Sequence, residues 1–239
     1  MTTHMLSSTL ILANPHGVDR VFTGEEDHVI TLQEAANLTR SYRAGSAANA
    51  VKAGYLGRDA IEAMLNQGLA VGIRIYFARR TDGLITFVLA AVKADRDDIF
   101  EGILSEDAWL CPPWCSSPNE LNSDRTTTYT SNARRVRFTG HENHFVTLAE
   151  AARLTRAFRE QAGPGVPKGG YFSRRIFELI FRQQGCVGLR VYLGMTDPGK
   201  LTFVLSGVDS TGEDMTQGVL GEDAWLCPPW CGKANPLNR

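Results

Sequence analysis

A repeat with an offset of 116 residues is the feature that most constrains how this chain can fold. The string Trp-Leu-Cys-Pro-Pro-Trp-Cys occurs at 109–115 and again at 225–231, and Phe-Thr-Gly at 22–24 recurs at 138–140. About 45 % of the positions aligned by this offset are identical, which is too many for convergence. A period of this length indicates duplication of a whole domain, not a solenoid of small repeats.

The repeat divides the chain into two units that we expect to pack together. We assign 1–20 to an N-terminal segment, 21–122 to repeat unit 1, 123–136 to a linker and 137–239 to repeat unit 2. Duplicated units tend to meet through equivalent faces, as the subunits of an isologous homodimer do. The sequence therefore predicts a pseudo-two-fold dimer within one chain.

Two helices are expected in each unit. The first opens with a capping box, Thr31-x-x-Glu34 in one unit and Thr147-x-x-Glu150 in the other. The second shows apolar residues three and four positions apart. The predicted helices cover 31–44, 58–67, 147–160 and 174–184, and the divergent segments 45–51 and 161–167 are predicted loops.

A β-hairpin is expected after the helices of each unit. β-branched residues fill two runs, and the Asp-Gly or Asp-Pro-Gly between them is typical of a turn. The predicted strands cover 71–78, 85–92, 187–194 and 201–208. Each unit is thus α-α-β-β, and the fold class is α+β. Because a lone hairpin is only marginally stable, the two antiparallel hairpins can gain stability by sharing one sheet.

Charge and the first residues bear on partners and location. With 25 basic and 26 acidic residues the formal net charge is -1, which argues against a nucleic-acid partner and against an anionic membrane surface. The apolar stretch 6–13 is interrupted by Ser7, Ser8 and Thr9 and has no basic cluster before it, so it is a poor signal peptide. We therefore expect a cytoplasmic protein.

The strongest chemical signal is the Cys-Pro-Pro-Trp-Cys motif that closes each unit. Cys111, Cys115, Cys227 and Cys231 form two pairs, with three residues between the members of each pair. Structural zinc sites use four thiolates in two such short-spaced pairs. In a reducing compartment we expect the two tails to meet around zinc, or to form two half-sites that other ligands complete.

Other thiol chemistry stays open at this point. An extended Pro-Pro segment would hold the flanking Cα atoms beyond the roughly 4.4 to 6.8 Å that a disulfide tolerates. A bond within each motif is therefore disfavoured unless a turn or a cis proline intervenes. A bond between motifs, such as Cys111 to Cys227, and free thiols of a redox protein are further alternatives. Cys186 lies in an apolar run and is expected to be a small buried residue.

Arginine and tyrosine alternate on one face of the first hairpin strand in each unit. These residues are Arg74, Tyr76, Arg190 and Tyr192. An Arg beside a Tyr can hold a carboxylate or phosphate, which would make a small-ligand site near the pseudo-dyad. The plainer interpretation, which we favour, is a salt bridge with a glutamate of the second helix, Glu62 or Glu178.

Two further pairs of residues are candidates for a functional role. His28 and His144 precede the first helix of each unit and could ligate a metal or move protons, although hydrogen bonds that order the helix start explain them as well. Trp114 and Trp230, inside the cysteine motif, are expected to be partly exposed and to offer contacts to a partner, although simple packing explains them as well.

No catalytic signature is present, neither a phosphate-binding glycine loop nor a Gly-x-Ser-x-Gly elbow. This lowers the expectation of an enzyme without deciding it. The predicted function is a non-catalytic binding or self-assembly module, a scaffold with tails fastened by metal or disulfide and with a protein or a second copy as partner. The alternatives are a small anionic-ligand binder or enzyme that uses the paired Arg and Tyr, and a thiol redox protein.

The order of motifs also carries a resemblance. Gly-x-Arg-x-Tyr at 188–192, followed by Cys-Pro-x-x-Cys at 227–231 and Asn-x-Leu-Asn at 235–238, resembles an uncharacterised bacterial family of short proteins. The likeness covers each unit from its first helix to its tail, and the single-copy members correspond to one half of this chain. The resemblance implies no particular activity.

Overall fold

The computed structural model describes residues 21–123, 137–197 and 199–239. The predicted N-terminal segment and all but the first residue of the predicted linker lie outside the described residues. The described chain contains four helices and two antiparallel sheets of six strands each, which confirms the predicted α+β class. None of these helices has the length and apolar character needed to cross a bilayer.

The four helices begin close to where the sequence predicts them. They are α1 (Leu32–Ala44), α2 (Arg58–Leu65), α3 (Leu148–Gln161) and α4 (Arg174–Phe181). At the start of α1 the Thr31 hydroxyl accepts a hydrogen bond from the Glu34 amide at 3.3 Å, and the Glu34 carboxylate accepts one from the Thr31 amide at 2.9 Å. These reciprocal bonds satisfy N–H groups that a helix leaves unpaired in its first turn. At α3 Thr147 repeats the first bond, whereas the Glu150 carboxylate binds Arg153.

Both sheets contain strands from both halves of the chain. The first sheet has the order β1-β11-β10-β9-β2-β6 and the second has the order β12-β8-β3-β4-β5-β7. The longer strands are β2 (Ala53–Gly57), β3 (Ala70–Arg79), β4 (Ile85–Lys93), β8 (Gly169–Ser173), β9 (Cys186–Met195) and β10 (Leu201–Asp209). The short strands are β1 (Val29–Ile30), β5 (Leu104–Ser105), β6 (Trp109–Cys111), β7 (Phe145–Val146), β11 (Leu220–Gly221) and β12 (Trp225–Cys227).

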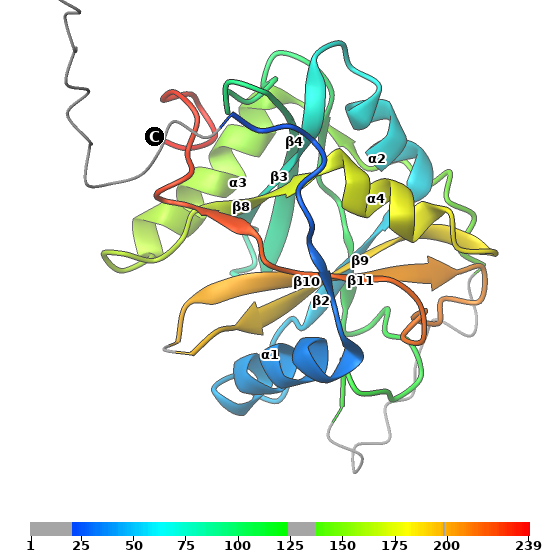
Figure 1. Ribbon diagram of the computed structural model, residues 1–239. Helices are drawn as coiled ribbons and strands as arrows, with labels where there is room; N and C mark the ends of the chain where they lie inside the picture. The colour runs from blue at the N-terminus through cyan, green and yellow to red at the C-terminus, as the bar shows by residue number, and fades with distance from the viewer. Residues whose placement is uncertain (1–20, 124–136, 198) are drawn as a thin grey trace, which may run out of the picture.

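The two hairpins do not share a sheet, so that expectation is wrong. The β3–β4 hairpin lies in the second sheet and the β9–β10 hairpin in the first (Figure 1). Each hairpin pairs instead with a five-residue strand from the other half, β9 with β2 and β3 with β8. The marginal stability of a lone hairpin is therefore relieved by strands exchanged between the halves.

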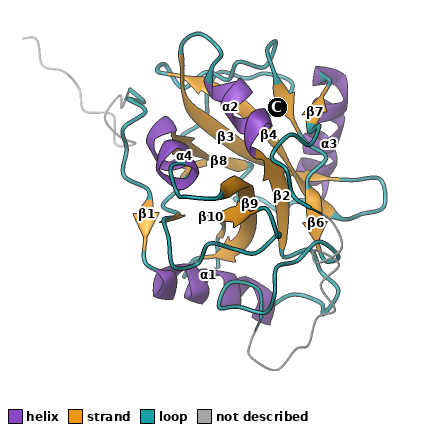
Figure 2. Ribbon diagram, turned by 90° about the vertical axis from the view of Figure 1, so that its right-hand side faces the viewer, coloured by secondary structure: helices purple, strands orange, loops and turns teal. Residues whose placement is uncertain are grey.

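The main core lies between the two sheets. Strand alternation places Ile73, Ile75 and Phe77 of β3 on the face that meets the other sheet, where Phe77 stacks on Phe203 with ring centroids 4.2 Å apart. The apolar faces of α2 and α4 belong to the same core. On the outer faces, α1 packs on β9 and β10, and α3 packs on β3 and β4 (Figure 1 and Figure 2). Both halves thus contribute to one continuous core.

Candidate functional site

Arg74 and Tyr76 lie in a closed polar cluster, and neither side chain has exposed surface. Their partner is Asp98, whose carboxylate forms a short ion pair with the Arg74 guanidinium and accepts a hydrogen bond from the Tyr76 hydroxyl at 2.5 Å. The side-chain amide of Asn235 donates to the same carboxylate at 2.7 Å. Arg74 also donates to the Trp230 carbonyl at 3.0 Å.

The same cluster recurs around Arg190 and Tyr192 with the halves exchanged. The Asp214 carboxylate pairs with Arg190, accepts from Tyr192 at 2.5 Å and accepts from the Asn119 side-chain amide at 2.8 Å. Arg190 reaches the Trp114 carbonyl at 3.4 Å. Each cluster therefore joins three side chains of one half to the tail of the other half.

This geometry corrects the expectations for the paired arginines and tyrosines. Their ionic partners are Asp98 and Asp214, not Glu62 or Glu178. Burial and the adjacent Asp98 charge raise the pKa of Tyr76 well above its usual value, so the hydroxyl remains a donor at neutral pH. We call the clusters around Asp98 and Asp214 the buried clasps, because each joins the two halves through side chains that have no exposed surface.

Sequence reasoning missed both aspartates, although a signal was present. Residues 91–100 are poorly matched to residues 207–216, and only Val92 and Asp98 are identical to their counterparts at the 116-residue offset. An identical acidic residue in an otherwise divergent stretch indicates a specific requirement for that carboxylate.

Each cysteine motif closes on itself through a disulfide. Cys111 is bonded to Cys115 and Cys227 to Cys231, and the Cα atoms of each pair lie 4.7 Å apart. The peptide bonds before both prolines of each motif are cis, so the segment is not extended. Our expectation that a bond within each motif is disfavoured is therefore wrong.

In this structure the four cysteines are not gathered at one place, as the expected four-thiolate zinc site would require. Their sulfurs are bonded in pairs, and the motifs begin on edge strands of different sheets, β6 in the first and β12 in the second. In the described part of the chain, no three or more His, Cys, Asp or Glu side chains are grouped to hold a metal. The cytoplasmic expectation came with an expectation of reduced thiols, and the two disulfides are instead typical of a non-reducing compartment. Cys186 is a buried free thiol, as predicted.

The tryptophans of the motifs are half-buried, in line with their predicted partial exposure. Trp114 packs on Trp109, and Trp230 packs on Trp225, with ring centroids 5.3 Å apart in each pair. A role of Trp114 and Trp230 in partner contact stays a prediction.

His28 and His144 are buried and each joins the two halves. Their Nδ1 atoms form hydrogen bonds at 2.9 Å with the carbonyls of Asp223 and Asp107, so Nδ1 carries the proton. The Nε2 atom of each ring is buried without a hydrogen-bond partner among the described residues. Burial lowers the pKa of both imidazoles, and the carbonyl acceptors oppose this only in part. Both rings are therefore neutral in the folded state at neutral pH.

Acidification is expected to destabilise the fold through these two histidines. Because their folded-state pKa values lie below the unfolded value near 6.5, the unfolded chain binds more protons below that pH. The stability that the neutral rings contribute is present above pH 6.5 and is lost as the pH falls. Between about pH 7.5 and 5.5 we expect the free energy of unfolding to fall by about 1 to 2 kcal/mol.

Urea titrations at both pH values measure this loss. The double variant His28→Asn/His144→Asn keeps a side-chain N–H donor without a titrating ring, and it should remove most of the pH dependence. An unchanged pH dependence in that variant would show that other groups cause it. The exposed His141 contributes a pH dependence of stability with the opposite sign, because its bond to Asp59 raises its pKa.

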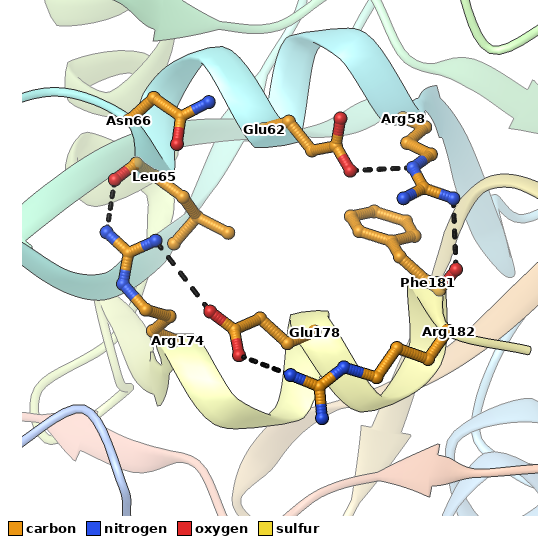
Figure 3. A pocket seen from close by; sticks show the side chains of 8 residues that line it. All are labelled: Arg58, Glu62, Leu65, Asn66, Arg174, Glu178, Phe181 and Arg182. Carbon is orange, nitrogen blue, oxygen red and sulfur yellow. Dashed lines mark hydrogen bonds and ion pairs between the residues drawn. The ribbon is translucent and has the colours of Figure 1, made fainter.

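A cleft between α2 and α4 gathers charged side chains from both halves and has a cavity volume of about 330 Å³ (Figure 3). Its lining residues are Arg58, Glu62, Leu65, Asn66, Arg174, Glu178, Phe181 and Arg182. Each lining position of α2 is matched by the α4 position that lies 116 residues later. The cleft is therefore built from equivalent parts of the two repeats.

Two arginines hold the helices as antiparallel walls of this cleft. Arg58, at the start of α2, donates to Glu62 at 2.6 Å and to the Phe181 carbonyl at the end of α4 at 3.0 Å. Arg174, at the start of α4, donates to the Leu65 carbonyl at the end of α2. These bonds satisfy carbonyl groups that a helix leaves free in its last turn. These hydrogen bonds from arginine side chains to main-chain carbonyls hold the two helices in position without a ligand.

Comparison with known proteins does not extend this picture: no family model, no curated protein and no solved structure matches the chain. The resemblance to the family of short bacterial proteins stays a prediction. The function is therefore inferred from the geometry of the chain's own residues.

Proposed function

We propose that this chain is a non-catalytic binding protein whose ligand site is the cleft between α2 and α4. The supporting observation is a contrast in exposure. Arg74 and Arg190 have no exposed surface, whereas the side chains of Arg58, Arg174 and Arg182 in the cleft are 39 %, 31 % and 74 % exposed. Ligand pockets are concave and carry polar groups that fix the orientation of a ligand, and this cleft has such groups beside Leu65 and Phe181.

The lining of the cleft favours binding over catalysis. It contains no thiol, hydroxyl, imidazole or amine that could act as a nucleophile. Its carboxylates are paired with guanidinium groups, Glu62 with Arg58 at 2.6 Å and Glu178 with Arg182 at 3.3 Å. General acid or base catalysis needs a group placed to exchange a proton with the substrate, and these carboxylates are already engaged.

The other hypotheses from the sequence gain less support. A ligand site built from Arg74, Tyr76 and their equivalents would require the buried clasps to open. A thiol redox function needs an accessible sulfur, but Cys111, Cys115 and Cys227 are at most 3 % exposed, and only Cys231 is half-buried.

The dimensions of the surface favour a small molecule over a protein partner. A volume of about 330 Å³ lies within the range of ligand pockets, whereas a stable protein interface buries about 800 Å² on each partner. The outermost strands of both sheets, β1, β6, β7 and β12, are two or three residues long, which gives little edge for strand addition between copies. Self-association stays a prediction from the sequence.

An NMR screen of the full chain tests this proposal. Members of a library of polar metabolites are added to labelled protein, and amide shifts are followed. We expect at least one compound to shift amides of α2 and α4. The variant Asn66→Trp, which fills the cleft from an exposed position, should abolish the shifts, and Glu120→Trp, exposed elsewhere, should not.

Two outcomes would contradict the proposal. One is that no compound in the library shifts an amide of α2 or α4. The other is shifts that survive in Asn66→Trp. Shifts that depend on protein concentration in the absence of any compound would instead support self-association.

A further inference from the structure

We infer that the α2–α4 cleft takes a small organic anion, a carboxylate or phosphate with an apolar body, and binds it in one orientation, with the anionic group at the Phe181 end. This inference rests on the proposed function and names its ligand class.

The charges of the lining favour an anion. Three guanidinium groups and two carboxylates surround the cavity, which leaves an excess of one positive charge (Figure 3). Glu178 lies 3.3 Å from Arg182 and 4.0 Å from Arg174, so two guanidinium groups share one carboxylate. An incoming anion would supply the missing negative charge.

The two ends of the cleft differ although they come from equivalent positions. One end carries Leu65 and Asn66, and the other carries Phe181 and Arg182. Substitution in one half has therefore removed the equivalence that duplication would produce. A cleft with unlike ends discriminates between the two orientations of a ligand that has one charged end.

The guanidinium group at the Leu65 end is largely committed to the protein. The Nη2 atom of Arg174 donates to the Leu65 carbonyl and to the Ala70 carbonyl, the latter at 2.9 Å. The neighbouring Asn66 adds an uncharged amide. This end therefore offers a ligand little positive charge.

Open N–H groups gather at the Phe181 end. Arg58 uses Nε and Nη1, and its Nη2 has no hydrogen-bond partner in the part of the chain that the structure describes. Among the described residues the Arg182 side chain makes one hydrogen bond, from Nη2 to Glu178 at 3.3 Å. Guanidinium N–H groups bind carboxylate and phosphate oxygens in bidentate fashion. The two arginines come from opposite walls: Arg58 stands beside the Phe181 ring, and the Arg182 side chain runs from the Phe181 end along α4 toward Glu178 (Figure 3).

The floor of this end suits an apolar body beside the anion. The Arg58 guanidinium carbon lies 5.3 Å from the centroid of the Phe181 ring, a cation–π arrangement that keeps the charge next to an aromatic surface. Leu65 continues the apolar floor toward the other end. An aryl or alkyl carboxylate or phosphate matches this arrangement, in which positive charge at one end is followed by apolar surface.

Titration of the full chain with benzoate, phenyl phosphate and neutral benzamide tests the inference. We expect both anions to bind at least about tenfold more tightly than benzamide, because only they can receive charge-assisted hydrogen bonds. Whichever anion binds more tightly identifies the head group. Arg182→Asn installs the residue of the equivalent position and should weaken benzoate binding about tenfold. Arg182 is mostly exposed, so the variant should fold.

Asn66→Arg, which adds a guanidinium group at the other end of the same cleft, tests the orientation and should raise benzoate affinity by less than about threefold. The matched control is Glu120→Arg, exposed outside the cleft, which should leave benzoate affinity unchanged. Equal binding of benzamide would overturn the choice of an anion. A gain in Asn66→Arg as large as the loss in Arg182→Asn would overturn the single orientation. If neither anion binds, the ligand class is wrong, while the proposed function fails only if the metabolite screen also finds no shifts that depend on Asn66.

Discussion

Asp98→Ala should lower the free energy of unfolding by about 3 to 5 kcal/mol, the largest effect we expect from any single substitution. The Arg74 guanidinium and the Asp98 carboxylate are both fully buried, so removing the carboxylate leaves a buried cation without its counter-charge. The hydroxyl of Tyr76 and the amide of Asn235 lose the same acceptor. Urea unfolding followed by circular dichroism measures the loss.

Asp95→Ala is the matched control, because Asp95 lies three residues away and its side chain is 55 % exposed. It should change stability by less than about 1 kcal/mol. Asp214→Ala, at the equivalent position, should cost about as much as Asp98→Ala, because Asp214 has equivalent partners in the other cluster. A cost for Asp98→Ala no larger than that of the control would mean that the buried clasp does not exist.

Gly72→Ala is expected to lower the free energy of unfolding by about 3 kcal/mol, because it forces a methyl group between the paired strands β3 and β8. A Cβ at this position would overlap the Phe172 carbonyl oxygen, which belongs to the main chain of β8 and cannot rotate away. The glycine of each Gly-x-Arg-x-Tyr motif is thus required where a strand of the other half approaches. Thermal and urea unfolding of the variant measure the effect.

Gly68→Ala provides the comparison for this substitution, since a Cβ there meets no atom within 4 Å. We expect the free energy of unfolding of Gly68→Ala to lie within about 0.5 kcal/mol of the wild-type value. Gly188→Ala repeats the test in the other half, where the added Cβ would overlap the Tyr55 ring. Equal stabilities of Gly72→Ala and Gly68→Ala would contradict the pairing of β3 with β8.

Local signals in the sequence were enough to place most helices and the long hairpins. The capping residue Thr31 marks the start of α1, and the β-branched runs mark β3, β4, β9 and β10 to within one or two residues. These elements are determined by periodicity, capping and turn chemistry within a few residues of chain. The alternation of side chains along β3 likewise predicts that Arg74 and Tyr76 share one face of the strand.

The exchanged strands β2 and β8 could not be found in this way. Residues 53–57, Ala-Gly-Tyr-Leu-Gly, have no β-branched residue and two glycines, so their propensity is that of a loop. The structure explains the first glycine, because a Cβ on Gly54 would lie 2.8 Å from the Cβ of Ala108. Close packing between distant segments therefore outweighs local propensity here.

The candidate site depended on contacts that no sequence pattern specifies. The Arg58–Glu62 and Arg174–Glu178 pairs have ordinary i,i+4 spacing, typical of solvated helix faces. Only the packing of α2 against α4 turns them into the walls of one cleft. The pairing of the cysteines could not be predicted from the motif either, because the backbone path through each Pro-Pro segment decides how its two cysteines meet.

Cleavage of the segment between the halves tests the central claim most directly, which is that the halves complete each other's sheets and clusters. A specific protease site is placed between Asp124 and Val136, the chain is cut, and the product is analysed by size exclusion without denaturant. Neither disulfide joins the halves, so only non-covalent contacts can keep the fragments together. We predict that both fragments elute together at the volume of the uncut chain. Two separate, folded fragments of about half that size would contradict the account.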